Sequence, residues 1–339
     1  MMSALPLPTT QSAIRFHAFG TPDVLAHETE LPLPTPGPGE VRIRVEASCV
    51  QFTDTLIRMG RYPDLRDPPP VTPGYDVVGR VDALGEGVTN VAVGDRVADL
   101  TMIGSHAQFT IRPAAGLVPV PESVDAAEAS TLILSWLTAQ QALFRAGELK
   151  PHQRVLITGG NGAVGQAAIV LAKQAGAEVF ATAGTRHHAL LRELGATPLP
   201  REDWLPSVRG TMDVVLDGIA ADRFRSPFAA LKRGGRLVAI GTTALASGPL
   251  FRIIAAAVTF VWLMVAPNGR KARFYSITAH RKRHPEAFRT DLAALMNLLA
   301  NGQIRPHVAR RIRFDEVAQA HRDLEAGGLT GKIVLLPKS

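Results

Sequence analysis

The chain of 339 residues lacks several features that would mark other classes of protein. Its single cysteine, Cys49, excludes an intrachain disulfide and a cysteine-rich zinc lobe. The N-terminal segment has no basic stretch followed by an apolar one, so we expect no secretory signal and a cytoplasmic protein. The longest apolar run, 253–266, is shorter than the roughly 18 residues of a spanning helix and indicates a buried or interface helix.

Lysine is also scarce. Only seven of the 37 basic residues are lysines, so arginine supplies most of a formal net charge of +7. Arginine suits phosphate and carboxylate partners. No helix-turn-helix, zinc-finger or aromatic–basic stacking pattern accompanies this charge, so we expect no nucleic-acid partner.

What the chain does contain is a glycine turn between a predicted strand and a predicted helix. The apolar run 155–157 precedes Gly160, Gly162 and Gly165, and apolar residues recur at helical spacing from 164 to 175. In a G-x-G-x-x-G turn the first glycine permits tight turning, the second lets the backbone approach a pyrophosphate, and the third lets helix and strand pack. A turn within a β-rich loop is the alternative, but this context favours a dinucleotide.

The rest of the pattern predicts an α/β chain of two domains. The first 120 residues are rich in proline and glycine and contain alternating segments such as 40–47 and 77–81, which indicates mostly strands. Asp125 begins a predicted capping box before a helix that runs to about Ala146. Beyond it, strand-like segments alternate with helical ones, which is typical of a doubly wound parallel sheet. These strands are predicted at 155–158, 178–183, 212–219 and 236–242, and a helix and a strand end the chain.

The second strand of this sheet bears on the cofactor. An NAD-binding unit carries an acidic residue about 20 positions beyond its glycines, but no acid lies between Glu178 and Glu193. Gly184, Thr185, Arg186 and His187 stand there instead, and they favour the 2′-phosphate of NADPH. The alternative is a solvated helix start with a few polar residues.

Four segments together, 50–64, 71–81, 134–143 and 155–165, resemble the zinc-independent quinone oxidoreductases of the medium-chain dehydrogenase/reductase superfamily. The resemblance covers nearly the whole chain. It implies a discontinuous GroES-like catalytic domain, residues 1–128 and 307–339, and a Rossmann domain that binds NADPH, residues 129–306.

The resemblance also identifies where zinc would lie in zinc-dependent members of the superfamily. The matching positions here are Gln51, Tyr75 and Leu134, none of which supplies the thiolate or imidazole that catalytic zinc prefers. We therefore predict no metal site. Alcohol oxidation benefits from a metal that stabilises the alkoxide, whereas a quinone or an α,β-unsaturated carbonyl accepts hydride with hydrogen-bond help alone. Without a metal we therefore expect reduction of such an acceptor.

Catalytic and cofactor residues follow from the same resemblance. Gln51 replaces an asparagine that lines the nicotinamide pocket, and Leu56 replaces a tyrosine. Tyr62 matches the proton donor of related enoyl-thioester reductases; alternatively its ring packs the pocket wall and water supplies the proton. The predicted cofactor-binding residues are Thr138, Gly160, Asn161, Gly162, Ala163, Val164, Gly165, Gly184, Thr185, Arg186, His187, Gly241, Thr242 and Thr243.

The apolar segment 251–266 and the basic cluster that follows, 268–273, leave several interpretations open. They predict a lipophilic wall for the substrate, a surface that contacts membrane or protein, or a dimer-interface or lid helix. Relatives are usually homodimers, and the segment 232–240 with the following helix could form that interface. Membrane contact is possible but not favoured. Besides quinone or enone reduction, the functional alternatives are an enoyl-thioester reductase and a non-catalytic NADPH-sensing or membrane-associated binding protein.

Overall fold

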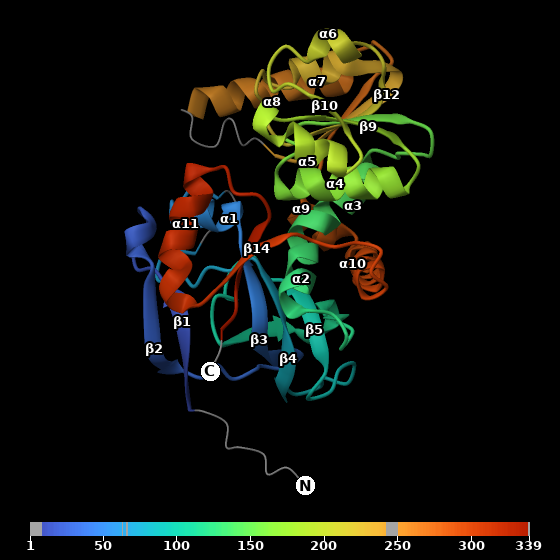
Figure 1. The fold of residues 1–339 in the computed structure, drawn as a ribbon. Coiled ribbons are helices and arrows are strands. Elements are labelled where there is room, and N and C mark those ends of the chain that lie inside the picture. The colour runs from blue at the N-terminus through green and yellow to red at the C-terminus, as the bar shows by residue number, and fades with distance from the viewer. Residues whose placement is uncertain (1–8, 63, 66, 242–249, 338–339) are drawn as a thin grey trace. The chain divides into compact units, whose positions relative to one another are not determined.

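A computed structural model describes residues 9–62, 64–65, 67–241 and 250–337 (Figure 1). The chain divides into two compact units. Unit 1 comprises Met1–Leu134 and Leu292–Ser339, and unit 2 comprises Ser135–Asp291. The predicted boundaries, 128/129 and 306/307, lie near these.

Unit 1 is built mainly from strands. Its elements are β1 (Thr10–Arg15), β2 (Ala26–Pro32), β3 (Glu40–Val50), α1 (Phe52–Arg58), β4 (Asp76–Leu84), β5 (Arg96–Leu100), β6 (Phe109–Pro113), β7 (Val118–Pro119), α2 (Ala126–Thr131), β14 (Val308–Ile312), α11 (Val317–Ala326) and β15 (Lys332–Leu335), with short 3₁₀ turns at Pro22–Val24, Ala114–Gly116 and Phe314–Glu316. Helix α10 (Pro285–Ala300) crosses the boundary between the units.

The larger sheet of unit 1 runs in the order β14-β15-β3-β4-β5-β7, and β6 also pairs with β3. The predicted strands 40–47 and 77–81 are confirmed as β3 and β4. Alternate residues of β3, among them Val41, Ile43 and Val45, point into a core with Val77 and Val97. β15 pairs antiparallel with β3, so a segment near the C-terminal end completes the sheet that the first half of the chain begins.

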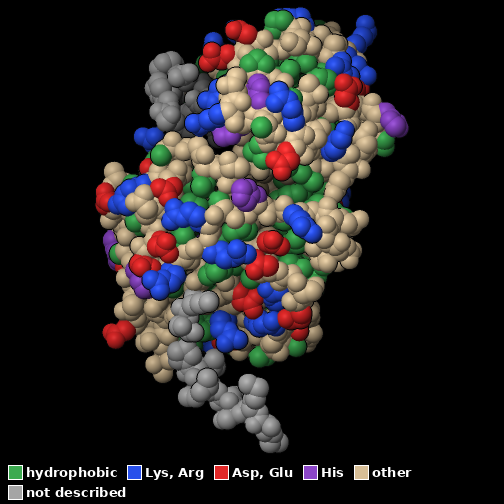
Figure 2. Space-filling model, viewed as in Figure 1, with side chains coloured by type: hydrophobic (Ala, Val, Ile, Leu, Met, Phe, Trp, Pro, Cys, Tyr) green, Lys and Arg blue, Asp and Glu red, His purple; other side chains and the backbone are tan. Residues whose placement is uncertain are grey.

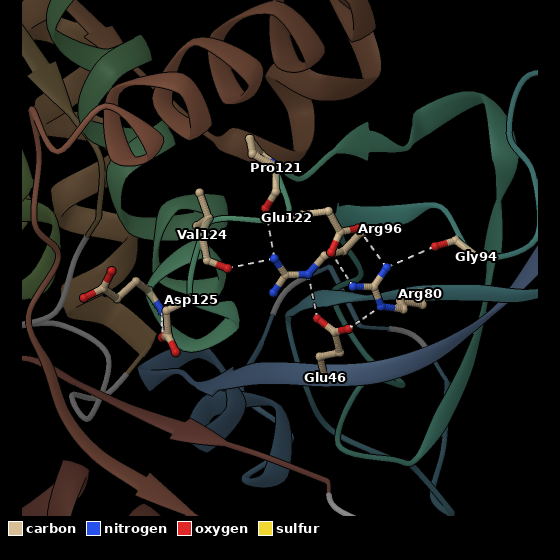
Figure 3. Close-up of polar contacts among 9 residues, drawn as sticks. Glu46, Arg80, Gly94, Arg96, Pro121, Glu122, Val124 and Asp125 are labelled. Atoms are coloured by element: carbon tan, nitrogen blue, oxygen red, sulfur yellow. Dashed lines mark hydrogen bonds and ion pairs between the residues drawn. The ribbon is translucent and has the colours of Figure 1, made fainter.

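An ion-pair network ties this sheet to the segment before α2 (Figure 3). The buried guanidinium of Arg96 donates to Glu46 at 2.7 Å and to the backbone carbonyls of Pro121 and Val124 at 2.9 and 2.7 Å. Arg80 pairs with the same carboxylate at 3.0 Å. A buried arginine satisfied on several sides holds its partners in one geometry, so these contacts fix where α2 begins.

The predicted helix 126–146 has the expected ends but not a uniform interior. Asp125 caps it by accepting a hydrogen bond from the backbone N–H of Glu128 at 3.0 Å. After α2 come a π-helical turn at Leu132–Trp136, α3 (Leu137–Gln140) and a second π-helical turn at Gln141–Ala146. Each π turn places one extra residue per hydrogen-bonded turn, which residue periodicity alone does not disclose.

Unit 2 is a parallel sheet with helices on both sides (Figure 1). Besides α3 its elements are β8 (Arg154–Ile157), α4 (Ala163–Gln174), β9 (Glu178–Thr182), a 3₁₀ turn (Thr185–His187), α5 (His188–Glu193), β10 (Thr197–Leu199), α6 (Leu205–Val208), β11 (Met212–Asp217), α7 (Arg225–Ala230), β12 (Leu231–Ala239), α8 (Leu250–Val265), β13 (Lys271–Phe274) and α9 (Ile277–Arg283).

The described strands of this sheet follow the order β10-β9-β8-β11-β12-β13. That is the doubly wound order of dinucleotide-binding domains. Successive strands are added on one side of β8 up to β10 and then on its other side from β11 onward, so the strand order reverses between β8 and β11. The four predicted strands are confirmed as β8, β9, β11 and β12. The two at the ends of the sheet were not predicted, because β10 has three residues including a proline and β13 has two basic residues in four.

Candidate functional site

The glycine turn of unit 2 joins β8 to α4 as the motif predicts. Two of its glycines are places where another residue would collide with backbone or core. A Cβ on Gly160 would lie 2.8 Å from the Cβ of Ala181, and one on Gly165 would lie 2.4 Å from the carbonyl oxygen of Gly159. Only Gly159, outside the triplet, has a left-handed backbone, with φ +66°. Close packing, more than left-handed geometry, therefore explains Gly160 and Gly165.

The remaining glycine, Gly162, is different. It is the N-cap of α4, and the nearest atom to a Cβ built there is the carbonyl oxygen of Gly159, at 3.4 Å. A side chain at this position would meet little, so the backbone here is open to close approach. The first N–H groups of a helix have no partner within the helix and carry partial positive charge, so those of Ala163 and Val164, next to Asn161, have the chemistry that a pyrophosphate needs. The residues present fit a dinucleotide.

Polar side chains hold this turn from behind. Thr158 donates to the carboxylate of Asp217 at the end of β11. That carboxylate also accepts the backbone N–H groups of Ile219 and Ala220, at 3.1 and 3.2 Å. Burial raises the pKa of Asp217, while the bond from Thr158 opposes the rise. Together these contacts join the ends of β8 and β11, the two strands between which the strand order reverses.

The predicted 2′-phosphate residues follow the end of β9. Gly184 precedes the 3₁₀ turn, on which Thr185 and Arg186 are exposed. The guanidinium of Arg186 donates to the ring of His187 at 3.0 Å. Burial, and then the positive charges of Arg186 and Arg201, lower the pKa of His187. The turn therefore places Arg186 against His187, and the positive charge of Arg201, which follows β10, also acts on this imidazole.

The other predicted cofactor residues lie in unit 2 as well. Thr138 is buried in α3, and Gly241 follows β12. A Cβ on Gly241 would meet the carbonyl oxygen of Gly218 at 3.3 Å, so this glycine lies close to the end of β11. Thr242 and Thr243 lie outside the described residues.

In unit 1 the predicted catalytic residue Gln51 is buried at the start of α1 with its amide engaged on both sides. Its Nε2 donates to Asp76 at 2.6 Å, and its Oε1 accepts from the ammonium of Lys332. Asp76 also accepts the backbone N–H of Cys49 at 2.7 Å. The amide orientation follows from this arrangement, because a lysine only donates and a carboxylate accepts.

A second buried carboxyl, that of Asp54, lies on the same helix. It accepts the backbone N–H groups of Gln51 at 2.7 Å and Gly74 at 3.1 Å. Burial raises the pKa of Asp54 to about 7 and that of Asp76 to about 6, while the positive charge of Lys332 opposes both shifts. Burial therefore brings the pKa values of these two carboxyls, Asp54 and Asp76, closer to neutral than those of exposed carboxyls.

Tyr62, the predicted proton donor, is bonded to another phenol. Its hydroxyl lies 2.5 Å from that of Tyr75, and the two rings meet edge to face with centroids 5.8 Å apart. Tyr75 is 1% exposed, whereas Tyr62 is only partly buried. Leu56, the other substitution in this motif, lies on α1.

The three positions that would hold zinc do not form a metal site. Gln51 is committed to Asp76 and Lys332, the phenol of Tyr75 meets Tyr62, and Leu134 has an apolar side chain. Across the described residues no group of three or more His, Cys, Asp and Glu side chains could hold a metal ion. The donor chemistry at these positions does not fit catalytic zinc.

The sequence did not predict the charged residues of the cluster around Gln51, which are Asp54, Asp76 and Lys332. Asp54 lies in segment 50–64 and Asp76 in segment 71–81, but residue type alone does not show that a carboxyl is buried. Lys332 is 281 residues from Gln51 and meets it only because β15 pairs with β3. The one available signal was an isolated lysine at the start of a final apolar strand.

Profiles of two known families match the chain. The alcohol dehydrogenase GroES-like domain matches residues 37–122, and the zinc-binding dehydrogenase domain matches residues 194–335. The quinone oxidoreductase of Sus scrofa is 30% identical over 338 residues, 96% of this chain and 97% of that protein. The chain belongs to the quinone oxidoreductase-like branch of the medium-chain dehydrogenase/reductase superfamily.

Other members of this superfamily extend the comparison. The human synaptic vesicle membrane protein VAT-1 homolog is 31% identical over 86% of this chain and 78% of its own length. A mycobacterial quinone oxidoreductase structure has a TM-score of 0.81 at 32% identity, covering 96% of this chain and all of that one. A mycobacterial relative solved with NADPH has the same TM-score at 31% identity over the same shares, and the enoyl reductase CurK has 0.82 at 25%, covering 97% and 99%.

Membership in this superfamily indicates the general class of reaction. The chain is an oxidoreductase related to quinone oxidoreductases and enoyl reductases, and its fold implies a nicotinamide cofactor. The GroES-like and Rossmann assignments are confirmed. None of the helices within the described residues is both long and apolar enough to cross a membrane.

The raised pKa of Asp54 predicts a pH-dependent stability. Between about pH 4 and 7 the unfolded chain releases this proton while the folded protein keeps it, so this carboxyl destabilises the fold as pH rises. We expect the free energy of unfolding of Asp54→Asn, relative to wild type, to increase by about 1–3 kcal/mol across this range. Urea denaturation at several pH values measures it.

The relevant quantity is the difference in unfolding free energy between Asp54→Asn and wild type at each pH. Burial lowers the pKa of His106 to about 4 and that of His321 to about 3, and these two histidines give the opposite slope in both proteins. Asp95→Asn, at an exposed carboxylate that accepts the N–H of Ala92 at 2.8 Å, is the matched control and should show no such trend. A flat difference for Asp54→Asn would contradict the prediction.

Proposed function

We propose that this protein is an NADPH-dependent, zinc-independent reductase of quinones or α,β-unsaturated carbonyls. The observation that carries the proposal is the replacement of the zinc ligands by a buried amide cluster and a hydrogen-bonded phenol pair. Such a site offers hydrogen bonds and a proton rather than a Lewis acid, which suits a conjugated acceptor. The similarity to quinone oxidoreductases supports the same class of substrate.

In this proposal the bound nicotinamide supplies a hydride, that is, one proton with two electrons. The Nε2 of Gln51 has two hydrogens, and Asp76 takes one, so the second binds the acceptor's carbonyl oxygen. Tyr62 donates the proton that converts the enolate or quinol anion into neutral product. Its phenolate then takes a proton from water, so the net reaction consumes one NADPH and one proton per acceptor reduced.

The proposed partner is therefore a lipophilic small molecule and not a nucleic acid. On the face in Figure 2, blue Lys and Arg side chains are interspersed with red Asp and Glu side chains over unit 1. A nucleic-acid surface would instead gather basic side chains along one face.

The direct test is oxidation of NADPH by purified protein with a panel of quinones, enals and enones. We expect turnover with at least one of these classes, followed as loss of NADPH absorbance. Binding of NADPH with no turnover on any acceptor would contradict the proposal and favour a nucleotide-sensing protein. Boiled protein and assays without acceptor are the controls.

Enoyl-thioester reduction is the second candidate, since Tyr62 matches the acid of related enoyl-thioester reductases and the CurK enoyl reductase is structurally similar. The same assay with a short enoyl thioester separates the two. A kcat/KM on the thioester about tenfold or more above the best quinone or enone would make the thioester the substrate class.

We also propose that the reduced cofactor is NADPH and not NADH. Arg186 and His187 follow β9, where an NAD-binding protein places an acid, and the positive charge of Arg201 after β10 acts on His187. A 2′-phosphate carries close to two negative charges, and charge-assisted bonds to guanidinium are among the strongest in proteins. The relative that was solved with NADPH supports this assignment.

Removing one of these arginines tests the preference. Arg186→Ala should weaken NADPH binding about tenfold or more and NADH binding less than about twofold, because only NADPH carries the phosphate. Fluorescence titration of the two cofactors measures this. Arg192→Ala, an exposed arginine on the neighbouring α5, is the matched control. Equal losses for both cofactors in Arg186→Ala would mean that Arg186 does not bind the phosphate.

The protein also exposes an apolar surface, which we define as the outer side of α8 with β13. Twelve large apolar residues are well exposed in the described chain, and seven of them lie on α8: Ile253, Ile254, Val258, Val261, Trp262, Met264 and Val265. Phe274, on β13, is an eighth. Monomeric proteins rarely leave so large an apolar patch uncovered.

We propose that a second copy of the chain covers this surface. β13 is the last strand in the order of the sheet, so its outer edge offers backbone N–H and C=O groups beside the apolar helix. A copy related by twofold symmetry presents the same edge and the same helix, and the pair covers both at once. A bilayer would leave the strand edge unpaired in an apolar medium.

A charge placed in this surface should separate the copies. We expect wild type to sediment as a dimer of the 36.2 kDa chain and Val261→Glu to weaken dimerisation at least about tenfold, because pairing would bury a carboxylate. Val93→Glu is the matched control, since Val93 and Val261 are 62% and 60% exposed. A monomeric wild type that floats with anionic vesicles would overturn the proposal in favour of membrane contact.

A further inference from the structure

The second phenol, Tyr75, stands at a position that carries a zinc ligand in zinc-dependent members of the superfamily, and among the described residues its hydroxyl bonds to that of the candidate acid, Tyr62. The Tyr75 ring is 1% exposed and stands edge-on to the ring of Tyr62. Its backbone carbonyl accepts the N–H of Thr101 at 2.9 Å, which fixes the residue from behind. The side chain is thus buried and held in place, with its hydroxyl 2.5 Å from that of Tyr62.

We propose that Tyr75 is a positioning residue that makes Tyr62 a stronger proton donor, by donating its own hydroxyl hydrogen to the oxygen of Tyr62. This inference rests on the proposed function, in which Tyr62 is the acid. A hydrogen bond to the charged form of a group stabilises that form. The phenolate that Tyr62 becomes after proton transfer would be held by the hydroxyl of Tyr75.

The direction of the bond follows from the step that the proposed function assigns to Tyr62. The hydroxyl hydrogen of Tyr62 is the one that passes to the acceptor, so the Tyr62 hydroxyl donates toward that acceptor. Its oxygen is then left to accept the hydrogen of the Tyr75 hydroxyl, 2.5 Å away. Two phenols alone would leave the direction open.

The groups around Tyr62 act on its acidity with opposite signs. Burial raises the pKa of Tyr62, and the negative charges of Asp64 and Asp54 raise it further. Within this set only the hydrogen bond from Tyr75 lowers it. Burial and the bond to Tyr62 raise the pKa of Tyr75 itself, so it stays protonated as a donor.

In the reaction the phenol proton passes from Tyr62 to the enolate or quinol anion. The electron pair of the broken O–H bond stays on Tyr62 as phenolate and accepts the hydrogen bond of Tyr75. Water then returns a proton to Tyr62. Tyr75 neither gains nor loses a proton over the cycle.

The kinetic test is Tyr75→Phe, which keeps the ring and removes the donor. We expect kcat to fall about tenfold with KM changed less than about twofold, because a weaker acid transfers its proton more slowly. The decline of kcat at high pH, where Tyr62 ionises, should move upward by about one unit or more. Purely structural damage would lower kcat without moving this limb.

A spectroscopic test does not need turnover. The chain has three tyrosines, Tyr62, Tyr75 and Tyr275, so protein labelled with 3-fluorotyrosine gives one ¹⁹F signal for each. Tyr62→Phe assigns the signal of Tyr62. Its titration midpoint should rise by about one unit or more in Tyr75→Phe and fall in Asp64→Asn, which removes a carboxylate that raises its pKa.

Tyr275→Phe is the matched control. It deletes another buried phenol, one that donates to Gln141 at 2.7 Å in unit 2, and should leave the midpoint of Tyr62 unchanged. If Tyr75→Phe fails to fold, Tyr75→Met provides a second apolar replacement. An unchanged or lowered midpoint for Tyr62 in either apolar variant overturns the proposal.

Failure of the proposed function is distinguishable from failure of this inference. A wild type that turns over no acceptor contradicts the reductase, while the fluorine titration still decides whether Tyr75 tunes Tyr62. Full turnover by Tyr62→Phe, with wild type active, removes Tyr62 as the acid and overturns the role of Tyr75 with it.

Discussion

The contact between the ammonium of Lys332 and the amide of Gln51 is the interaction on which the buried polar cluster of Gln51, Asp54 and Asp76 depends. This ammonium donates to Gln51, and its positive charge favours the ionised forms of two buried carboxyls, Asp54 and Asp76. Without Lys332 the pKa values of both carboxyls would rise further, and Gln51 would lose one of the two partners that fix its amide. A residue remote in the sequence thus acts on the charge of two carboxyls and on the orientation of one amide at the start of α1.

The fold could be predicted where residue type repeats with a period. Valines and isoleucines of β8, β11 and β12 are buried on both faces, and such continuous apolar strands are visible in any sequence. β13 is not visible in this way, since Lys271 and Arg273 make an edge strand look like a loop. The π turns after Thr131 also escape prediction, because an extra residue in a turn changes hydrogen bonding without changing composition.

The site was predictable where one short segment contains all the information. The turn from Gly160 to Gly165 is such a segment, and close packing explains its first and last glycines. The cluster around Gln51 is different in kind, because its members come from α1, β4 and β15 and meet only after the sheet forms. Tyr75 shows a further limit: by sequence it is only a missing zinc ligand, and its contact with the hydroxyl of Tyr62 becomes visible only in the structure.

The pairing of β15 with β3 has a consequence for how the protein is made. Unit 2 is one continuous stretch, Ser135–Asp291, and leaves the ribosome complete while unit 1 still lacks its last strand. Domains fold as units during synthesis, so the second half of the nascent chain can fold before the first. Until β15 emerges, Asp54 and Asp76 lack the charge of Lys332 and Ser48–Val50 of β3 lack this strand partner, so a chain stopped before β15 would contain a complete unit 2 and an incomplete unit 1.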